Sequence, residues 1–291
     1  MLREYLALRK DGLIDAVYVA DKSKVALERA GKEGRLDGTA TSVKALLPKV
    51  DAVHIATRNE LHYPIAKEAL EAQRHVLLEK PMTTDSHTAY ELAERASAAG
   101  VVLQTGHIYR FNNAIHEIKK LLDKKFFGKV YYTRFQWTTK MPSPEGIDIV
   151  WDLMPHPLDI MHYLTGEWPK ETVGVARSFR RNGPSETAFI TALYPGGQPV
   201  NFELSWLRPI RSRSMEIVGE KRDAIVDCAG QKIEIVEDGK PKPHPVKVNN
   251  TVRDEVTHFV KSIGQRKNPL NSAIIGARNV QAIEAILQSV R

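Results

Sequence analysis

Two kinds of hydrophobic pattern alternate along the first hundred residues. Segments with apolar residues at helical spacing occur at 2–10, 24–34, 61–73 and 85–100. Between them lie short apolar runs rich in β-branched residues, at 13–21, 51–59, 74–81 and 101–107. Strands that alternate with helices of this length predict a Rossmann-like, doubly wound parallel sheet.

The pattern changes from about residue 126 onward, where alternating runs follow one another with short turns between them. We predict strands at 129–139, 171–179, 187–194, 199–207, 214–220, 223–228 and 232–238, with hairpin turns at 194–200 and 237–242. Helical patterns are confined to 155–166, 251–264 and 272–290. The chain is therefore predicted to have an α/β domain at 1–107 and an α+β domain with a large, mostly antiparallel sheet at 108–291.

Composition narrows the class of protein. No apolar run approaches the roughly 20 residues that span a bilayer, and the charged N-terminus lacks a signal-peptide core. The single cysteine, Cys228, cannot form an internal disulfide, so we expect a cytoplasmic protein. The net charge of +7 is compatible with an anionic partner or with solubility alone. Without a Lys/Arg block, a zinc spacing or an aromatic RNA-binding signature, we expect no nucleic-acid partner and no membrane partner.

The sequence contains no G-x-G, and thus no glycine-rich turn of the kind that holds a dinucleotide pyrophosphate. The first predicted strand ends at Asp21, whereas in dinucleotide folds such an acidic residue ends the second strand, about 20 residues after the glycines. The simplest interpretation is that strand one and the phosphate loop are absent and that Met1 lies inside or before the first helix. The alternative is a chain that binds no dinucleotide.

Two short stretches carry candidate chemistry. In "EKP" (79–81), Pro81 keeps Lys80 out of the helical region and permits a cis peptide bond. Lys80 should then lie at the carboxyl end of a parallel strand, where open α/β sheets bind ligands. A surface lysine at a turn is the alternative.

The second stretch, "WDLMPHPLDIM" (151–161), places Asp152, His156 and Asp159 at spacings of four and three, so one helix face would hold all three. Its two prolines fit only near a helix start, which makes 152–155 the helix entry. Three interpretations are open: a metal site, a capping Asp with a packed His, or an acid/base pair. A metal needs three or more ligands, and no second cluster completes a set.

Residues 51–82, 106–115 and 151–166, in this order and spacing, resemble the glucose-fructose oxidoreductase, inositol dehydrogenase and MocA (Gfo/Idh/MocA) family. The resemblance implies an NAD(P)-dependent oxidoreductase that transfers a hydride between a nicotinamide cofactor and a secondary alcohol of a sugar, cyclitol or sugar nucleotide. It also implies a homodimer or homotetramer formed through the C-terminal sheet. The cofactor is expected to be NAD, with NADP possible, since Asp21 would repel a 2′-phosphate while Lys22 and Lys24 would not.

The resemblance also assigns roles to residues. It implies catalytic roles for Lys80, Asp152 and His156, and cofactor contacts for Asp21, Thr57, Asn59, His62, Glu79 and Lys80. Substrate contacts are implied for Tyr109, Arg110, Asp152 and His156, and no metal is expected. Arg58 stands where the family usually has a proline. His62 could equally be a structural residue at a helix N-terminus, Arg110 an ordinary ion-pair residue, and Asp159 a support for its helix.

Two other functions stay open on the sequence alone. The first is a non-catalytic or truncated family member that binds a sugar ligand or a partner chain without the dinucleotide. The second is a metal-dependent hydrolase or aldolase.

Overall fold

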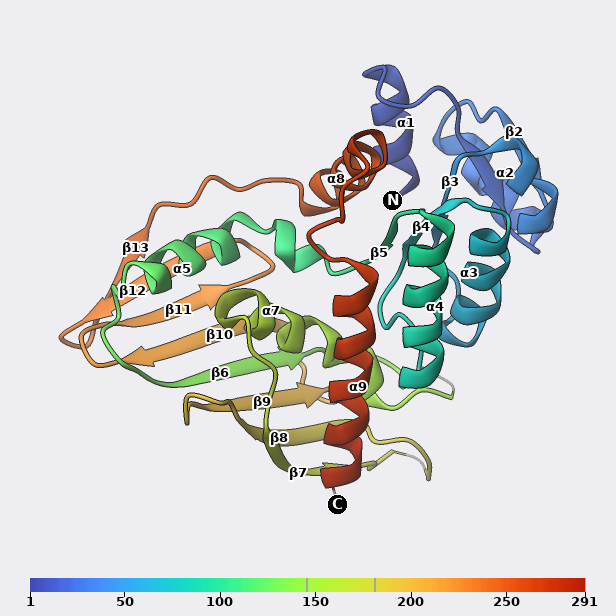
Figure 1. Ribbon diagram of the computed structural model, residues 1–291. Helices are drawn as coiled ribbons and strands as arrows, with labels where there is room; N and C mark the ends of the chain where they lie inside the picture. The colour runs from blue at the N-terminus through green and yellow to red at the C-terminus, as the bar shows by residue number, and fades with distance from the viewer. Residues whose placement is uncertain (145, 181, 291) are drawn as a thin grey trace. The chain divides into compact units, whose positions relative to one another are not determined.

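The computed structural model describes residues 1–144, 146–180 and 182–290 (Figure 1). The chain divides into two compact units. The first consists of Met1–Ile108 together with Asn250–Val280, and the second of Tyr109–Asn249 together with the described residues from Gln281 onward. Each unit has its own buried core and is described by itself.

Parallel strands form the centre of the first unit, in two separate sheets. One sheet pairs β1 (Tyr18–Ala20) with β2 (Gly38–Ala40), and the other has the order β3-β4-β5. The bounds of the latter strands are Ala52–Ile55, His75–Leu78 and Leu103–Thr105. Three consecutive residues of β4, Val76 to Leu78, are fully buried, as expected for a parallel strand covered on both faces. The prediction of a Rossmann-like parallel arrangement is confirmed.

Helices of the first unit follow the predicted pattern. They are α1 (Leu2–Lys10), α2 (Lys24–Glu33), α3 (His62–Glu71), α4 (Ser86–Ala99) and α8 (Thr251–Gln265), with short 3-10 turns at Val43–Ala45, Leu47–Lys49 and Asn59–Leu61. The bounds of α4 have a local cause at each end. The Asp85 side chain accepts a hydrogen bond from the Thr88 amide, and Gly100 ends the helix at φ +65°.

Two features of the first unit differ from the sequence prediction. The strand β2 is not predicted, because its three residues, Gly-Thr-Ala, show no apolar periodicity. The helix α8 packs with the N-terminal residues rather than with the rest of segment 108–291. Val256 and Phe259 of α8 share a buried cluster with Leu8 of α1 and Leu77 of β4. Such a long-range association leaves no mark on local patterning.

The second unit is built on one eight-stranded sheet with the order β13-β12-β11-β10-β6-β9-β8-β7. All neighbours are antiparallel except β6 and β9. The bounds are β6 Val130–Thr138, β7 Glu171–Arg177, β8 Thr187–Leu193, β9 Pro199–Ser205, β10 Ser212–Gly219, β11 Asp223–Asp227, β12 Lys232–Glu237 and β13 Lys240–His244. The predicted large, mostly antiparallel sheet is confirmed.

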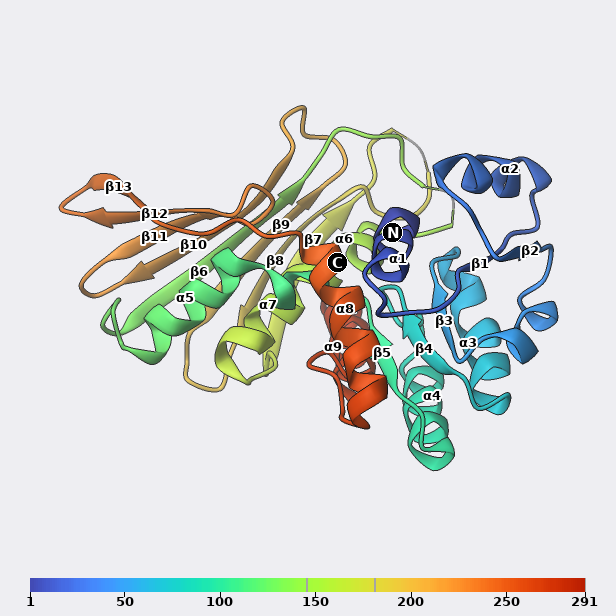
Figure 2. The ribbon, with the colours of Figure 1, turned by 90° about the horizontal axis from the view of Figure 1, so that it is seen from above.

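Helices cover one face of this sheet, as Figure 2 shows for α5 (Asn113–Asp123) and α7 (Pro155–Thr165). Ile118 and Leu158 from these helices are fully buried in the same core as Phe135 of β6. The short helix α6 (Ile149–Leu153) precedes α7, and the end of α9 (Ala273–Ser289) adds Ile283 to that core. Residues of β7 and β8 alternate between more and less exposed, so the other face of the sheet points away from the core.

One edge of the sheet holds a strand that the sequence does not predict. β13 contains Pro241 and Pro243, which cannot donate to a sheet ladder and are tolerated only at an edge. The turn before it was predicted at 237–242. Asp238 and Gly239 have φ values of +50° and +71° there, as a two-residue hairpin turn requires.

Candidate active site

Polar residues follow the carboxyl ends of β3 and β4 in the first unit. The two strands are parallel neighbours, with Ile55 opposite Leu78, so the residues directly after them lie at the same sheet edge. Open α/β sheets bind ligands at this edge. Thr57 is exposed there, while Asn59 and Lys80 are partly exposed. All three are therefore accessible at this edge, and their contact with a cofactor stays a prediction.

His62, the first residue of α3, joins these two strand ends. Its Nδ1 lies 2.9 Å from the Pro81 carbonyl oxygen and its Nε2 lies 3.1 Å from the Thr57 carbonyl oxygen. The Lys80–Pro81 peptide bond is cis. Burial lowers the pKa of the His62 imidazole, and the two carbonyl contacts oppose that effect. Only 1% of the His62 surface is exposed, so the residue cannot line a cofactor directly. We assign it a structural role, which is to hold the turns after β3 and β4 together.

Glu79 is also engaged inside the first unit. Its Oε1 lies 3.4 Å from His54 Nε2, and the Nδ1 of that histidine lies 3.0 Å from the Tyr5 hydroxyl. Burial acts to raise the pKa of the Glu79 carboxyl, but His54 and the Lys80 charge outweigh it, so the pKa is lowered. Gly106 passes so close that a Cβ there would lie 2.9 Å from Glu79 Oε2. A side chain at this position would therefore crowd Glu79.

Asp21 lies directly after β1 and is exposed. Its Oδ1 accepts a hydrogen bond of 2.8 Å from the Ser23 amide, and the Ser23 hydroxyl in turn caps α2 through the Ala26 amide. The carboxylate thus shapes the turn and remains accessible. Its predicted contact with a ribose is compatible with this position.

Asp152 and His156 come from two short helices in the second unit rather than from the entry of one. Asp148 caps α6, which contains Asp152, and Met154 separates that helix from α7, which starts at Pro155. The prolines occupy the first turn of α7, where their missing N–H groups have no helical partner. His156 is the only residue of 153–160 that is not buried. Its neighbours are buried, whereas His156 is partly exposed although its Nδ1 is a buried atom.

Aromatic side chains support both of these residues. The Trp206 indole donates a hydrogen bond from Nε1 to Asp152 Oδ2 over 3.2 Å. The Tyr109 ring meets the His156 ring edge to face, with centroids 5.2 Å apart, and meets the Trp137 ring at 5.3 Å. Both tryptophans are fully buried, so they form a rigid floor. An imidazole with partial exposure and a fixed carboxylate can accept and orient the proton of a hydroxyl group.

Arg110 and Asp159 are bound to each other in the interior of the second unit. The Arg110 Nε donates to both carboxylate oxygens of Asp159, at 2.8 and 3.0 Å, and its Nη2 lies 2.7 Å from His162 Nδ1. Arg110 is 3% exposed and Asp159 1% exposed. The predicted substrate contact of Arg110 is therefore replaced by the ion-pair alternative. Asp159 does not share an open face with Asp152 and His156, because its charge is neutralised inside the unit.

A second buried carboxylate holds the loops that precede α6 and β8. Glu186 accepts hydrogen bonds from the Ser143 hydroxyl, from Arg180 Nε at 2.8 Å, and from the amides of Phe179 and Arg180 at 2.8 Å. Burial acts to raise the pKa of this carboxyl, but the hydrogen bonds outweigh it and lower the pKa to about 2. The network is not predicted from the sequence.

Sequence reasoning missed the residues around the Asp152 and His156 side chains. Trp137 is the penultimate residue of β6, Trp206 follows β9, and Arg213 belongs to β10. The one local signal is the segment "WLRPIRSR" (206–213), which carries three arginines from the end of β9 into β10.

Among residues 1–144, 146–180 and 182–290, no group of three or more His, Cys, Asp or Glu side chains is placed to hold a metal ion. None of the helices in the same residues has the length and apolar character needed to cross a membrane.

Comparison with known proteins identifies the family of this chain. Residues 2–107 match the model of an oxidoreductase family with an NAD-binding Rossmann fold, and residues 115–225 match the Gfo/Idh/MocA C-terminal domain. The chain belongs to the Gfo/Idh/MocA oxidoreductase family. The resemblance drawn from the three motifs is thus confirmed.

Relatives of this Gfo/Idh/MocA protein include dehydrogenases of sugars, cyclitols and UDP-sugars. It is 31% identical over 267 residues to UDP-N-acetylglucosamine 3-dehydrogenase of Acidithiobacillus ferrooxidans, covering 85% of this chain and 83% of that protein. It is 24% identical over 299 residues to the NAD(+)-dependent scyllo-inositol 2-dehydrogenase of Bacillus subtilis, covering 94% and 86%. A solved structure of the A. ferrooxidans enzyme has a TM-score of 0.87 at 26% identity and covers 99% of this chain and 93% of its own.

Proposed function

We propose that this family member is an NAD(P)-dependent oxidoreductase acting on a secondary alcohol of a sugar, a cyclitol or a sugar nucleotide. The observation that carries the proposal is that a partly exposed His156 packs on Tyr109, while the Asp152 carboxylate, four residues earlier, is held by Trp206. The names of the relatives, which act on UDP-N-acetylglucosamine and scyllo-inositol, support the substrate class.

The first unit offers residues for the cofactor. Asp21 after β1 fits the ribose hydroxyls, and its negative charge favours NAD over NADP. Thr57, Asn59 and Lys80 after β3 and β4 fit the remainder of the cofactor. The Lys80 charge acts on the Glu79 carboxylate, and His62 holds the two strand ends together. When bound, a nicotinamide ring accepts or returns the hydride.

The residues of this chain would handle the proton and the developing charge. In the direction of oxidation, His156 removes the hydroxyl proton, since an imidazole titrates near neutral pH. Asp152 accepts a hydrogen bond from a substrate hydroxyl and orients it, with Trp206 fixing the carboxylate. The Lys80 ammonium stabilises the alkoxide character of the substrate oxygen. In the reverse direction, His156 returns the proton to the carbonyl oxygen.

The test uses Lys80→Ala and His156→Ala, with Lys49→Ala and His87→Ala as controls, because the two control side chains are exposed. NADH and NADPH are titrated by fluorescence, and turnover with UDP-N-acetylglucosamine and scyllo-inositol is followed by nicotinamide absorbance. We expect kcat to fall by about 10²–10⁴-fold in His156→Ala and by about 10²-fold or more in Lys80→Ala. Turnover that both variants retain at the control level would refute the assignment.

A non-catalytic role is the second candidate. Such a protein would bind a sugar or a partner chain without a dinucleotide. It predicts saturable binding of a sugar-type ligand with no change in NADH or NADPH fluorescence at any protein concentration tested. Saturable binding of either dinucleotide contradicts it.

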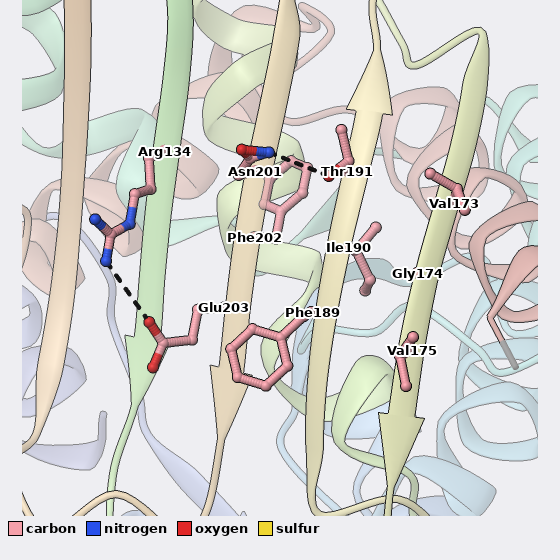
Figure 3. A pocket seen from close by; sticks show the side chains of 10 residues that line it. All are labelled: Arg134, Val173, Gly174, Val175, Phe189, Ile190, Thr191, Asn201, Phe202 and Glu203. Carbon is pink, nitrogen blue, oxygen red and sulfur yellow. Dashed lines mark hydrogen bonds and ion pairs between the residues drawn. The ribbon is translucent and has the colours of Figure 1, made fainter.

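We also propose that the protein forms a homodimer or homotetramer through the open face of the eight-stranded sheet. A hollow of about 450 Å³ lies on this face, and Figure 3 shows the side chains that line it. Its apolar side chains are well exposed, with Val173 at 65%, Phe189 at 57% and Val175 at 49%. Beside them Arg134 lies 3.9 Å from a Glu203 carboxylate oxygen. Apolar and oppositely charged groups on one face suit a self-complementary interface.

Phe189→Glu tests this interface, and Val25→Glu is the matched control, since Val25 is a similarly exposed apolar residue on α2. In analytical ultracentrifugation, we expect Phe189→Glu to shift the protein to a smaller species, because a charge is costly to bury in an interface. Val25→Glu should sediment like the wild type. A monomeric wild type, or an unchanged Phe189→Glu, would contradict the proposal.

A further inference from the structure

Arg213 presents a fixed guanidinium group beside the candidate catalytic residues of the second unit. Its Nη1 donates to the Thr138 and Ser212 carbonyl oxygens, at 2.9 and 2.8 Å, and its central carbon lies 5.7 Å from the Trp137 ring centre. Within the described part of the chain, Nε and Nη2 of Arg213 have no hydrogen-bond partner and neither is a buried atom. The Nη1 atom of Arg213 is therefore held by the protein, whereas its Nε and Nη2 atoms remain available to a ligand.

Arg211 lies two residues earlier and adds a second positive charge. It is exposed, and it makes no hydrogen bond or ion pair with any residue of 1–144, 146–180 or 182–290. Arg208, the third arginine of this segment, differs because its Nη1 lies 4.0 Å from a Glu203 carboxylate oxygen. Two of the three guanidinium groups thus keep accessible donors.

Both charges act on Tyr109, and Arg213 also interacts with Asp152. Burial raises the pKa of the Tyr109 hydroxyl, and the positive charges of Arg213 and Arg211 oppose that rise. Burial and the Arg211 charge lower the pKa of Arg213, whereas the Asp152 charge raises it. Trp137, under the Arg213 guanidinium, also packs against Tyr109, which in turn meets His156. The arginine pair therefore lies in electrostatic reach of the residues proposed to handle the substrate hydroxyl.

Holding two like charges together in a partly buried setting is unfavourable in itself. A group with two or more anionic oxygens would offset the repulsion and match the planar fork of a guanidinium, as phosphate and carboxylate groups do. A neutral sugar offers no such compensation.

We propose that Arg211 and Arg213 bind an anionic group, a phosphate or a carboxylate, that is covalently part of the sugar-type substrate. The inference rests on the proposed function for the identity of the substrate as an alcohol. Within that function it selects nucleotide sugars, sugar phosphates and sugar acids over neutral sugars and cyclitols.

Isothermal titration calorimetry on the full chain tests the proposal without requiring turnover. The probes are UDP-N-acetylglucosamine for a diphosphate, D-glucuronate for a carboxylate, and N-acetylglucosamine and scyllo-inositol as neutral ligands. The variants are Arg211→Gln, Arg213→Gln and Arg213→Lys, and Arg208→Gln is the matched control from the same segment. Circular dichroism checks that Arg213→Gln is folded, and the exposed Arg211 can be replaced without loss of packing.

We expect at least one anionic probe to bind the wild type more tightly than both neutral probes. Its Kd should rise by about 10- to 100-fold in Arg211→Gln and in Arg213→Gln, the range for a lost hydrogen bond to a charged group. Arg213→Lys should recover only part of the affinity, because an ammonium lacks the fork. Arg208→Gln should stay within about 2-fold of the wild type, because its partly exposed pair with Glu203 is long, at 4.0 Å, and such pairs contribute little.

Three results would overturn the inference: no saturable binding of either anionic probe, equal affinity for anionic and neutral probes, or unchanged affinity in both Gln variants. The anionic probe that responds identifies phosphate or carboxylate. Failure of this inference is distinct from failure of the proposed function. The former is seen in the Arg211 and Arg213 variants by calorimetry, and the latter in the Lys80 and His156 variants by nicotinamide absorbance.

Discussion

Replacement of Asp159 by alanine tests whether Arg110 is a structural residue. Asp159→Ala removes three contacts with Arg110 of 2.8 to 3.0 Å and leaves a guanidinium whose side chain is only 4% exposed. Breaking a buried ion pair by removing one partner costs about 3–5 kcal/mol. His162 Nδ1, 2.7 Å from Arg110 Nη2, retains part of the solvation of the cation. We therefore expect a loss near the lower limit, about 3 kcal/mol in the free energy of unfolding.

The assay is urea denaturation followed by tryptophan fluorescence. All four tryptophans, at 137, 151, 168 and 206, lie in the second unit, so their signal reports on the unit that contains the Arg110–Asp159 pair. Asp123→Ala is the matched control, because Asp123 pairs with Lys119 on the helix surface at 3.2 Å and such pairs contribute about 0.3–0.5 kcal/mol.

A double variant separates loss of the pair from loss of either side chain. Arg110→Met combined with Asp159→Leu replaces the pair by apolar groups, which is often neutral or stabilising in a buried setting. We expect the double variant to recover most of the stability lost in Asp159→Ala. The reasoning would be refuted if Asp159→Ala unfolded within about 1 kcal/mol of the control. It would also be refuted if Arg110→Met weakened substrate binding while stability stayed unchanged.

Three further predictions follow from single contacts. Glu186 has its pKa lowered to about 2 from an ordinary 4.5, so its stabilisation is complete above pH 4.5 and is lost as the pH falls toward 2. In fluorescence-monitored unfolding, the free energy of unfolding of Glu186→Gln should therefore fall less than that of the wild type as the pH is lowered from 4.5 toward 2. The same pH dependence in both proteins would contradict the prediction. Gly276→Ala places a Cβ 2.1 Å from Thr105 Oγ1, so thermal unfolding should show a loss of about 1–3 kcal/mol that the added change Thr105→Ala reduces. Trp206→Phe removes the hydrogen bond to Asp152, so kcat/KM should fall by about 5-fold with the fold intact, whereas an unchanged value would exclude a positioning role.

Local patterning determined much of the fold. The alternation of short apolar runs with helical segments predicted the parallel arrangement, and the successive alternating runs after residue 126 predicted the mostly antiparallel sheet. These features are predictable because strand and helix periods depend on neighbours a few residues apart. Two strands were not predicted: β2, because it lacks an apolar pattern, and β13, because it contains two prolines.

Motif spacing likewise identified the candidate site residues, but it did not predict the side chains that each of them contacts. "EKP" and "WDLMPHPLDIM" pointed to Lys80, Asp152 and His156, and prolines correctly marked a helix start at 155. The break of the helix at Met154, which separates Asp152 from the helix of His156, was not foreseen.

Tertiary structure alone decided the roles of the surrounding side chains. Arg110 meets Asp159 across 49 residues, Trp206 meets Asp152 across 54, and His62 reaches the Pro81 carbonyl across 19. The same holds for the packing of α8 on α1 and for the position of Arg213 over Trp137. Such pairings depend on how whole elements pack together and exclude water. Because that packing is a property of the assembled core, it cannot be predicted from a short segment of the sequence.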